Sequence, residues 1–495
     1  MHTYTRLIHL LWLIALMVIC LPSIARAVAL FSEESELFLP WASYQGQVYT
    51  VRMKQEDENP PVLQLTEIHS REISPTPGAI ATVDDDLAVS IPLVSYRGEL
   101  YNVTLNNTGQ GSFEIANATP VPVSTDRGTA LSVTQMETKT TAQIATEYPL
   151  AILAGLNLRY DVAVYRISYQ TQDALGNSAT ASGVIGVPLG IQAGAPLLSF
   201  QHGTISSRAQ APSINLEATG ADIALYLMGA RGYLVVVPDY LGFGDSDGLH
   251  PFMHAKTLAW SVIDLIRAAR ALATDNAFPL NGQLFLAGYS EGGYATMAAQ
   301  REIETHHADE LTITASAPMA GAYDLSGTML QQVLSGDPLP KPMYYPYVLL
   351  AYNAIYGFDD DITSLLSREI AETVVELFDG THDSDTIDAA LPSSSNELFA
   401  LTLINALESG SYHPLRTALE NNDVYRWTPV SPTRLYHCLD DERVPYENSV
   451  VATDYFAAAG ADIKLETLFF SNHTDCAIPA LLNGNTWFDT LVQLP

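Results

Sequence analysis

Positive charge is scarce in this chain of 495 residues. Lysine and arginine together number 23 against 55 aspartates and glutamates, so the formal net charge at pH 7 is −32. A surface of this sign repels the phosphates of DNA and RNA, which excludes nucleic acid as a partner. The acidity is typical of a protein that must stay in solution outside the cytoplasm, and it carries no information about chemistry.

Long apolar runs are equally rare, and the one that exists lies at the N-terminus. Leu7–Leu21 follows Arg6 and precedes Ala25-Arg26-Ala27, which has the small-residue pattern of a cleavage site. The run is too short for a stable membrane-spanning helix. We therefore expect residues 1–27 to be a signal peptide, cleaved after Ala27, and the mature protein to be exported to the periplasm or secreted.

Cysteine is the third scarcity. The sequence has three cysteines, and removal of the signal peptide with Cys20 leaves Cys438 and Cys476. Two thiols in an exported protein usually pair, so we predict a Cys438–Cys476 disulfide. The alternative is a pair of unrelated buried thiols.

The N-terminal part contains a repeat. Residues 39–53 match residues 91–105, about 52 positions later, and each copy alternates apolar and polar residues after a glycine. This pattern predicts β-hairpins, with a further short strand after each copy at Val62–Leu65 and Ser112–Ile115. We interpret residues 28–125 as a small β-rich module with two repeats, joined to the rest by a linker at Thr119–Thr125. A binding or anchoring role and a purely structural role stay equally open.

Residues 126–495 show the pattern of an α/β domain. Val162–Tyr169 and Thr180–Pro188 predict a hairpin, and helices are expected at Leu258–Ala271, Tyr294–Glu304 and Asn448–Ala458. Buried strands alternating with helices predict a mostly parallel sheet with helices on both faces. The buried strands are expected at Pro196–Phe200, Tyr233–Pro238, Gln283–Ala287, Leu311–Ala317, Thr433–Cys438 and Ile463–Phe470.

The stretch 325–432 lacks an obvious core strand and is expected to be a helical cap or lid. Helical patterns occur at Ser367–Phe378 and Glu397–Glu408, and five tyrosines gather near the start of the stretch, at positions 344, 345, 347, 352 and 356. The tyrosines can be explained in two ways, as the cap's own core or as the lining of an apolar substrate pocket.

The pentapeptide Gly288-Tyr289-Ser290-Glu291-Gly292 carries the strongest chemical signal. It reads G-x-S-x-G and stands between a predicted buried strand and a predicted helix. In that context the motif predicts a sharp turn that presents the serine hydroxyl above the sheet. Ser290 is therefore our candidate nucleophile.

A serine nucleophile needs a base and an acid that orients the base. In a fold of this kind the acid follows the serine in the chain and the histidine comes last. Asp441 is the first choice for the acid, with Asp440 second and Glu442 third, because all three follow the strand Thr433–Cys438. His473 follows the last predicted strand and is the candidate base.

The developing oxyanion needs two backbone N–H groups. One is expected from Glu291, directly after the nucleophile, and the other from Thr204, with Gly203 giving the backbone room. We expect His202 to brace this loop by hydrogen bonding. His306, His307 and Asp309 could suggest a metal site, but a solvated helix end explains them better, so no metal and no cofactor are predicted.

Taken together, these motifs resemble the α/β-hydrolase fold lipases and esterases, especially secretory lipases of the Candida antarctica lipase A type and their bacterial relatives. The resemblance covers roughly residues 150–495. It implies an α/β-hydrolase fold with a helical cap, the triad Ser290, Asp441 and His473, and hydrolysis of carboxylic esters. Cys438 is a departure, since relatives often have glycine before the acid loop. The motifs are Phe200–Thr204, Val237–Ser246, His250–Phe252, Ala287–Gly293 and Tyr436–Tyr446.

The sequence thus predicts an exported serine carboxylic-ester hydrolase, a lipase or esterase that works through an acyl-enzyme. A serine peptidase of the same fold is one alternative, because fold alone does not decide the substrate. A noncatalytic surface-binding protein that uses the N-terminal repeats is another. The expected partner is a small-molecule or lipid ester, with contact to a cell surface or lipid interface left open. The sequence does not specify the oligomeric state.

Overall fold

The computed structural model describes residues 27–44, 47–58, 61–71, 81–84, 87–149, 155–359, 361–469 and 472–495. The predicted signal peptide therefore lies outside the described residues, apart from Ala27. The chain forms two compact units. The first comprises Met1–Tyr96, Leu100–Val121 and Ile355–Gly357, and the second comprises Arg97–Glu99, Pro122–Ala354 and Phe358–Pro495. The main change of unit, after Val121, falls slightly before the boundary expected at residue 125.

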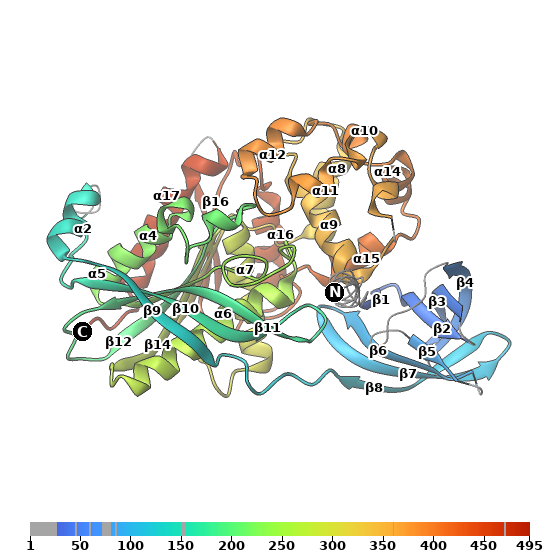
Figure 1. Cartoon of the computed structure of the whole chain (residues 1–495), viewed down its shortest axis with the longest axis horizontal. Helices are drawn as coiled ribbons and strands as arrows, with labels where there is room; N and C mark the ends of the chain where they lie inside the picture. Colours follow the sequence, from blue (N-terminus) through green and yellow to red (C-terminus); the bar gives the residue numbers. More distant parts are fainter. Residues whose placement is uncertain are drawn as a thin grey trace, which may run out of the picture. The chain divides into compact units, whose positions relative to one another are not determined.

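The first unit is an eight-stranded sheet, drawn in blue in Figure 1. Its strands follow the order β1-β2-β3-β4-β8-β7-β6-β5, and further pairings join β1 to β6 and β2 to β5, so the sheet curls on itself. The similar segments of sequence contribute β2–β3 and β6–β7. The strands are β1 (Ala29–Phe31), β2 (Glu36–Tyr44), β3 (Gln47–Glu58), β4 (Pro61–Arg71), β5 (Ala81–Val83), β6 (Val89–Tyr96), β7 (Glu99–Gly109) and β8 (Ser112–Pro120).

The second unit is built on a nine-stranded sheet with the order β17-β16-β15-β14-β12-β13-β11-β10-β9. Strands β17, β16, β15, β14, β12 and β13 pair in parallel, each with the next in this order. The remaining pairs, β13 with β11, β11 with β10 and β10 with β9, are antiparallel. The strands are β9 (Ala130–Lys139), β10 (Val162–Gln172), β11 (Ser178–Pro188), β12 (Ala195–Gln201), β13 (Leu234–Pro238), β14 (Leu280–Tyr289), β15 (Ala315–Met319), β16 (Thr433–Cys438) and β17 (Ile463–Leu468).

Two strands of this nine-stranded sheet differ from the sequence-based expectation. The edge strand β9 was not expected, because its apolar side chains such as Leu131 and Val133 are exposed and leave no buried pattern. Strand β15 begins at Ala315 rather than at Leu311. The Leu311 amide instead closes the turn after a helix by donating to the His307 carbonyl at 2.8 Å, and parallel pairing with β14 starts only at Ala315.

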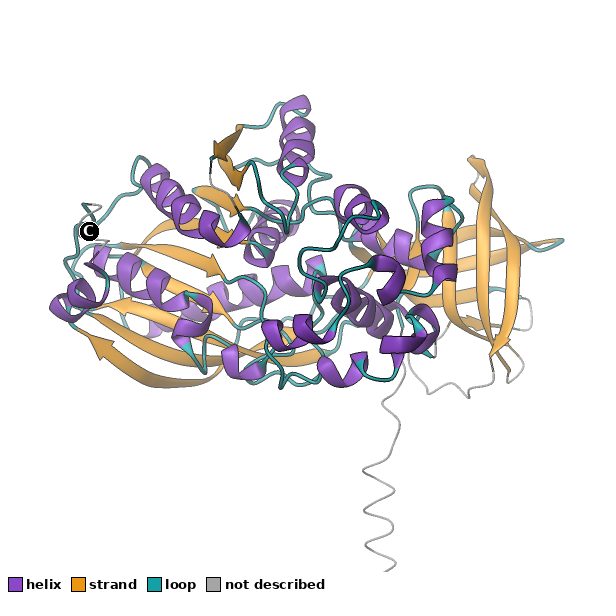
Figure 2. Ribbon diagram, turned by 90° about the horizontal axis from the view of Figure 1, so that it is seen from above, coloured by secondary structure: helices purple, strands orange, loops and turns teal. Residues whose placement is uncertain are grey.

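Helices cover both faces of this sheet (Figure 2). One face packs in a single apolar core against the segment around Tyr226 and against α17 (His473–Phe488). The other face meets α6 (Ala255–Asp275) and α7 (Glu291–His306). Thr296 of α7, for example, donates a hydrogen bond of 2.7 Å to the Gln201 side chain at the end of β12. The parallel sheet with helices on both faces is the arrangement that the alternating pattern predicted.

Short helices complete this core. They are α2 (Thr141–Glu147), η1 (Arg208–Gln210), η2 (Leu216–Thr219), α4 (Ala221–Ile223), η3 (Ala224–Met228), α5 (Gly229–Arg231) and, between β16 and β17, α16 (Glu447–Ala458). No helix among the residues that the structure describes is long and apolar enough to cross a membrane.

The stretch between β15 and β16 is made of short helices joined by loops. Neither of the two long helices expected there exists as one piece. Phe399 is extended and forms an isolated bridge with Leu366, which separates α13 from α14, and Glu372 and Thr373 separate α10 from α11. The helices are η4 (Leu325–Met329), α8 (Leu330–Leu334), α9 (Tyr344–Tyr356), η5 (Ile362–Leu365), α10 (Arg368–Ala371), α11 (Val374–Leu377), α12 (Ser384–Ala390), α13 (Ser395–Leu398), α14 (Leu401–Glu408) and α15 (Pro414–Asn421).

Candidate active site

Ser290 occupies a sharp turn between β14 and α7. Its backbone has φ +62° and ψ −124°, a conformation that residues other than glycine rarely adopt. A Cβ on Gly288 would lie 2.3 Å from the Gly292 carbonyl oxygen, and one on Gly292 would lie 2.0 Å from the Gln201 carbonyl oxygen. Only glycine therefore fits at both flanks, and the turn places the serine side chain at the carboxyl end of the sheet.

The candidate base and acid form a hydrogen-bonded chain with Ser290. His473 Nε2 lies 2.9 Å from Ser290 Oγ, and its Nδ1 lies 2.6 Å from Asp441 Oδ2. All three side chains are buried. His473 is the first residue of α17, and Asp441 stands in the loop after β16. The fold thus brings together residues that are 183 and 32 positions apart in sequence.

The Asp441 carboxylate is surrounded by donors. Its Oδ1 accepts the backbone N–H groups of Arg443 at 3.0 Å and Val444 at 2.9 Å. Burial by itself would raise the pKa of Asp441, but hydrogen bonds from His437 and His473 outweigh it and hold that pKa well below its ordinary range. The acid is therefore ionised at neutral pH.

The other two candidates for the acid lie elsewhere. Asp440 is exposed. Glu442 accepts the backbone N–H of His473 at 2.8 Å and so supports the base loop instead of the imidazole. Among these three carboxylates, only Asp441 contacts the imidazole of His473 in the described structure.

The residues expected to bind the oxyanion gather around the nucleophile. Glu291 is the first residue of α7, so its backbone N–H is one of those that no preceding turn satisfies. A Cβ on Gly203 would lie 3.7 Å from Ser290 Cβ, which places the loop after β12 beside the nucleophile. Thr204, Ser290 and Glu291 line one cavity.

His202 braces the loop after β12, which contains Gly203 and Thr204. Its Nδ1 lies 2.7 Å from the Gly203 carbonyl oxygen, and its ring stacks on Tyr240 with the centroids 4.3 Å apart. Tyr240 in turn donates its hydroxyl to the His202 carbonyl at 3.1 Å. Burial lowers the pKa of His202, which keeps the ring neutral.

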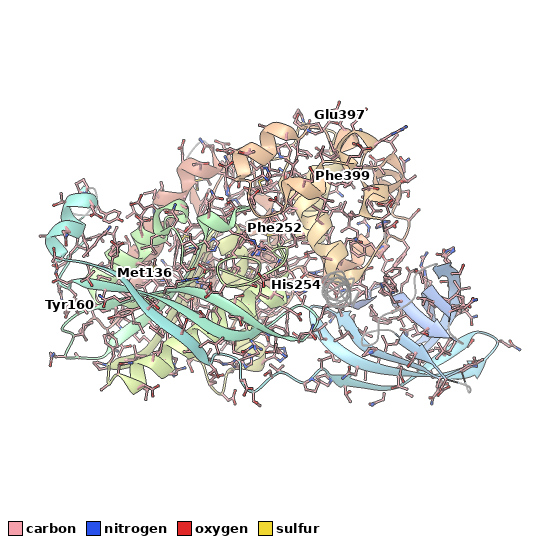
Figure 3. The ribbon with its side chains drawn as sticks, viewed as in Figure 1. Met136, Tyr160, Phe252, His254, Glu397 and Phe399 are labelled. Carbon is pink, nitrogen blue, oxygen red and sulfur yellow. A yellow bond between two sulfur atoms is a disulfide. The ribbon has the colours of Figure 1, made fainter. Side chains whose placement is uncertain are left out.

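The cavity at Ser290 is a cleft with about 850 Å³ of empty space, part of it open to solvent. Its wall comes from the loop before α6 and from the stretch between β15 and β16; Phe252 and Phe399, labelled in Figure 3, belong to it. Glu291 is the single charged residue among the described residues that line it. The apolar lining includes Leu330, Val333, Leu349, Leu403, Leu407 and Leu419.

The tyrosines at the start of this stretch fill both of the expected roles. Tyr344 and Tyr345 line the cavity. Tyr347 stacks on Phe252, with ring centroids 4.5 Å apart, and Tyr352 donates its hydroxyl to the Met253 carbonyl at 2.8 Å. The cluster therefore builds the inner packing of the cavity wall as well as part of its surface.

Two buried histidines next to the site were not identified from the sequence. His250 Nε2 lies 2.7 Å from Glu291 Oε1, and its Nδ1 lies 2.7 Å from the Leu241 carbonyl oxygen. His437 lies 3.2 Å from Asp441. Both stand inside the motifs that carry the family resemblance, which was the available signal, but nothing in their spacing predicted which groups they contact.

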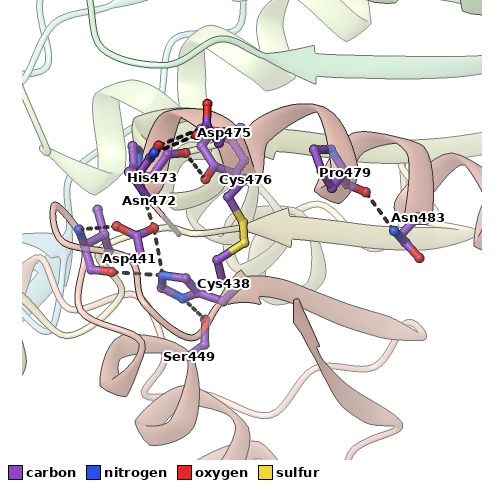
Figure 4. The surroundings of a disulfide bond; sticks show 12 residues. Cys438, Asp441, Ser449, Asn472, His473, Asp475, Cys476, Pro479 and Asn483 are labelled. Carbon is purple, nitrogen blue, oxygen red and sulfur yellow. Dashed lines mark hydrogen bonds and ion pairs between the residues drawn. A yellow bond between two sulfur atoms is a disulfide. The ribbon is translucent and has the colours of Figure 1, made fainter. Parts of the chain in front are cut away.

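The predicted disulfide is present. Cys438 ends β16 and Cys476 lies in the first turn of α17, with their Cα atoms 6.0 Å apart (Figure 4). The bond connects the two segments that carry Asp441 and His473. Both cysteines are fully buried.

The histidine pair at the end of α7 is less solvated than expected. His306 lies 2.9 Å from Glu99, and these two residues with Glu302 bring ligand atoms within 4.8 Å of one another. The Lys256 ammonium already occupies this cluster, 2.7 Å from Glu99 and 3.0 Å from Glu302. The arrangement is that of a half-buried ion-pair network, in which the Lys256 ammonium faces both carboxylates.

Comparison with known proteins identifies the family of this chain. The rice cell wall degrading esterase LipA from Xanthomonas oryzae is 30% identical, with a TM-score of 0.65 over 73% of this chain and 96% of the esterase. A protein from Legionella pneumophila is 26% identical, with a TM-score of 0.69 over 73% of this chain and 98% of its own.

Candida antarctica lipase A in its closed state shares the fold at 17% identity, with a TM-score of 0.56 over 74% of this chain and 84% of the lipase. No curated protein matches the chain by sequence. The model of the secretory lipase family matches residues 207–491, which is more than half of the chain. The chain belongs to the secretory lipase family, and its second unit has the α/β-hydrolase fold.

Proposed function

We propose that this lipase/esterase-type hydrolase is an exported serine enzyme that cleaves carboxylic esters through an acyl-enzyme. Ester hydrolysis as such follows from the family. The finer assignment rests on one observation, the hydrogen-bonded chain from Ser290 through His473 to Asp441 at the sharp turn after β14.

In the proposed first half-reaction, His473 Nε2 takes the proton of Ser290 as Oγ attacks the ester carbonyl carbon. The tetrahedral oxyanion is stabilised by the backbone N–H groups of Glu291 and Thr204. Collapse of this intermediate breaks the bond to the alcohol oxygen, which leaves with the proton held by His473. Asp441 keeps the imidazole oriented and stabilises its charged form.

The second half-reaction repeats these steps with water. His473 removes a proton from the water molecule, and the resulting hydroxide attacks the acyl carbonyl on Ser290. Collapse releases the carboxylic acid and returns the proton to Ser290. The apolar cavity gives the acyl chain a place to lie throughout, because a hydrocarbon chain gains free energy when it leaves water.

The cavity favours an ester substrate over the peptidase alternative. A peptidase that recognises a free amino terminus needs an acidic group to pair with the ammonium ion. Among the described residues of the cavity lining, Glu291 alone is acidic, and one of its oxygens is bound to His250. The assembled hydrogen-bonded chain also argues against a purely noncatalytic binding protein.

Export is supported by the family and by the N-terminal segment of the sequence. The buried Cys438–Cys476 bond is of the kind that persists in oxidising compartments. The β-rich N-terminal module carries no assigned role, and a cell-surface or lipid-interface contact for it stays a prediction.

The Ser290→Ala variant tests the mechanism. We expect its turnover of p-nitrophenyl esters to fall by roughly 10⁶-fold, because attack on the carbonyl then has no nucleophile. A fluorophosphonate should modify the wild-type protein at Ser290, as located by mass spectrometry of the peptides. Modification of another serine with Ser290 untouched would refute the proposal, and faster turnover of aminoacyl amides than of esters would favour the peptidase.

A further inference from the structure

A second histidine, besides His473, contacts the proposed acid of the triad. His437, on β16, is fully buried. Its Nε2 lies 3.2 Å from Asp441 Oδ2, the same oxygen that binds His473. That nitrogen also lies 2.9 Å from the Val444 carbonyl oxygen, and Nδ1 lies 2.8 Å from Ser449 Oγ. The proposed mechanism assigns no step to this ring.

The neighbours of His437 determine where its hydrogen lies. A carbonyl oxygen and a carboxylate oxygen can only accept, so Nε2 must carry the hydrogen that both of them face. Nδ1 has the Ser449 hydroxyl as its partner, and a hydroxyl can either donate or accept. His437 therefore donates from Nε2 whether or not Nδ1 is protonated.

The ring joins three segments through these contacts. Its N–H holds Val444, at the end of the acid loop, and faces Asp441, at the start of that loop, while Ser449 fixes the ring from α16 (Figure 4 labels Asp441 and Ser449). The backbone N–H groups of Arg443 and Val444 bind the other carboxylate oxygen. Without His437, the loop keeps those two bonds but loses the side-chain contacts from β16 to Val444 and Asp441.

The charged and titratable groups that face Asp441 come from several elements. His437 lies on β16, His473 on α17, and Tyr289 on β14. Glu442 and Arg443 belong to the same loop as Asp441, and they contact each other at 3.3 Å. Of these groups, the two histidines are the donors that the described structure places on Asp441 Oδ2.

We propose that His437 is a positioning residue for ester hydrolysis, which holds the Asp441 carboxylate in the orientation that aligns His473 with Ser290. The proposal rests on the triad proposed above. Loss of the Nε2 donor has two consequences. First, the acid loop becomes less well ordered, and the imidazole of His473 is then misaligned. Second, the Asp441 carboxylate loses one hydrogen bond, so the Asp441–His473 pair binds a proton more tightly.

The test compares His437→Phe with His437→Gln. Phenylalanine keeps a ring of similar size without a donor, whereas the glutamine amide nitrogen reaches the Nε2 position with two hydrogens for Val444 and Asp441. The measurement is the rate of Ser290 modification by a fluorophosphonate between pH 4 and pH 9. Circular dichroism and the melting temperature establish that each variant is folded.

The modification rate should fall as the pH is lowered, and for His437→Phe we expect the midpoint of this fall to rise by about one pH unit, a tenfold change in proton affinity. The plateau rate should fall by roughly ten- to a hundredfold, because a misplaced imidazole reacts more slowly. His437→Gln should restore most of both quantities. If His437→Phe does not fold, Ser449→Ala frees the ring at its other nitrogen and should change both quantities in the same direction by a smaller amount.

Three results would overturn this inference. The first is a folded His437→Phe protein whose pH midpoint and plateau rate equal those of the wild type. The second is a His437→Gln protein whose pH midpoint and plateau rate equal those of His437→Phe. The third is an unchanged Ser449→Ala profile where the phenylalanine variant cannot be measured. Failure of the wild-type protein to react at Ser290 is a different outcome, since it refutes the proposed function itself.

Discussion

At the scale of single residues, the choice among three neighbouring acids depends on burial and hydrogen bonding. Asp440, Asp441 and Glu442 all follow the same predicted strand, and the sequence ranks Asp441 first among them. In the fold, Asp440 points to solvent, Glu442 binds a backbone N–H of the base loop, and Asp441 meets the imidazole. A carboxylate can orient a histidine only if it reaches Nδ1, so the functional difference between these residues is geometric.

Substitution of Asp441 should separate it from its neighbour. We expect Asp441→Asn to lower ester turnover by about 10⁴-fold, because the amide favours the imidazole tautomer that cannot accept the Ser290 proton. Asp440→Asn is the matched control, with the same chemical change one position away, and should cost far less. Steady-state kinetics of both variants on a p-nitrophenyl ester decides the question, and a reversed order of the effects would assign the role to Asp440.

At the scale of elements, α14 presents one face to the cavity and another to solvent. Leu403 is buried with 2% of its surface exposed and lines the cavity, whereas Leu401, two positions earlier, is 61% exposed. The same substitution can therefore be made at Leu403, inside the proposed acyl site, and at Leu401, outside it, as a matched control.

We expect Leu403→Trp to shorten the space for the acyl chain. Turnover of p-nitrophenyl dodecanoate should fall by roughly tenfold or more relative to p-nitrophenyl acetate, since the pocket no longer holds the distal methylenes. Leu401→Trp should leave this ratio unchanged. An unaltered chain-length profile in a folded Leu403→Trp protein would mean that the acyl chain lies elsewhere.

The start of α6 gives this protein a specific sensitivity to acid. His254 is the N-cap residue of α6, and its ring accepts from the Thr257 backbone N–H. Burial, with a smaller contribution from the Lys256 charge, lowers the pKa of His254 to about 3. In the unfolded chain the pKa of histidine is about 6.5, so the unfolded state binds a proton that the folded state does not. Stability is therefore lost as the pH falls below about 6.5.

His254→Asn should remove this part of the acid sensitivity, because asparagine caps a helix without titrating. Between pH 7 and pH 5 the wild-type protein should lose about 2 kcal/mol of unfolding free energy more than the variant. Urea unfolding at the two pH values measures the difference. Equal losses in both proteins would show that His254 is protonated in the folded state.

At the scale of the whole molecule, the disulfide closes a long loop and ties the acid segment to the base segment. Cys438 and Cys476 are 38 positions apart. Closure of such a loop stabilises the folded state by about 4 kcal/mol in the chain-entropy model. We expect the double variant Cys438→Ser and Cys476→Ser to melt at a lower temperature and to lose more activity at 25 °C than its unfolded fraction explains. Two free thiols in the denatured, unreduced protein would contradict this prediction.

Much of the second unit follows from local pattern in the sequence. The β10–β11 hairpin, the parallel strands β12, β13, β14, β16 and β17, and the helices α6, α7 and α16 lie close to where alternation and apolar runs predict them. Segments of this kind can be predicted from the sequence because each buries a regular set of side chains. Strand β9 and the broken helices of the cap could not be predicted, because exposed apolar residues and single extended residues such as Phe399 leave no periodic signal.

The sequence by itself determined the family, the order of the strands along the chain, and the short list of candidates for the nucleophile, base and acid. G-x-S-x-G and the position of His473 after the last strand are local features, so they can be read without a fold. The sequence ranked Asp441 first of three neighbouring acids, and tertiary structure alone showed that it meets the imidazole, as it alone placed His250 on Glu291 and His437 on Asp441. These contacts join residues on different elements, and their geometry depends on how those elements pack, which no stretch of sequence records.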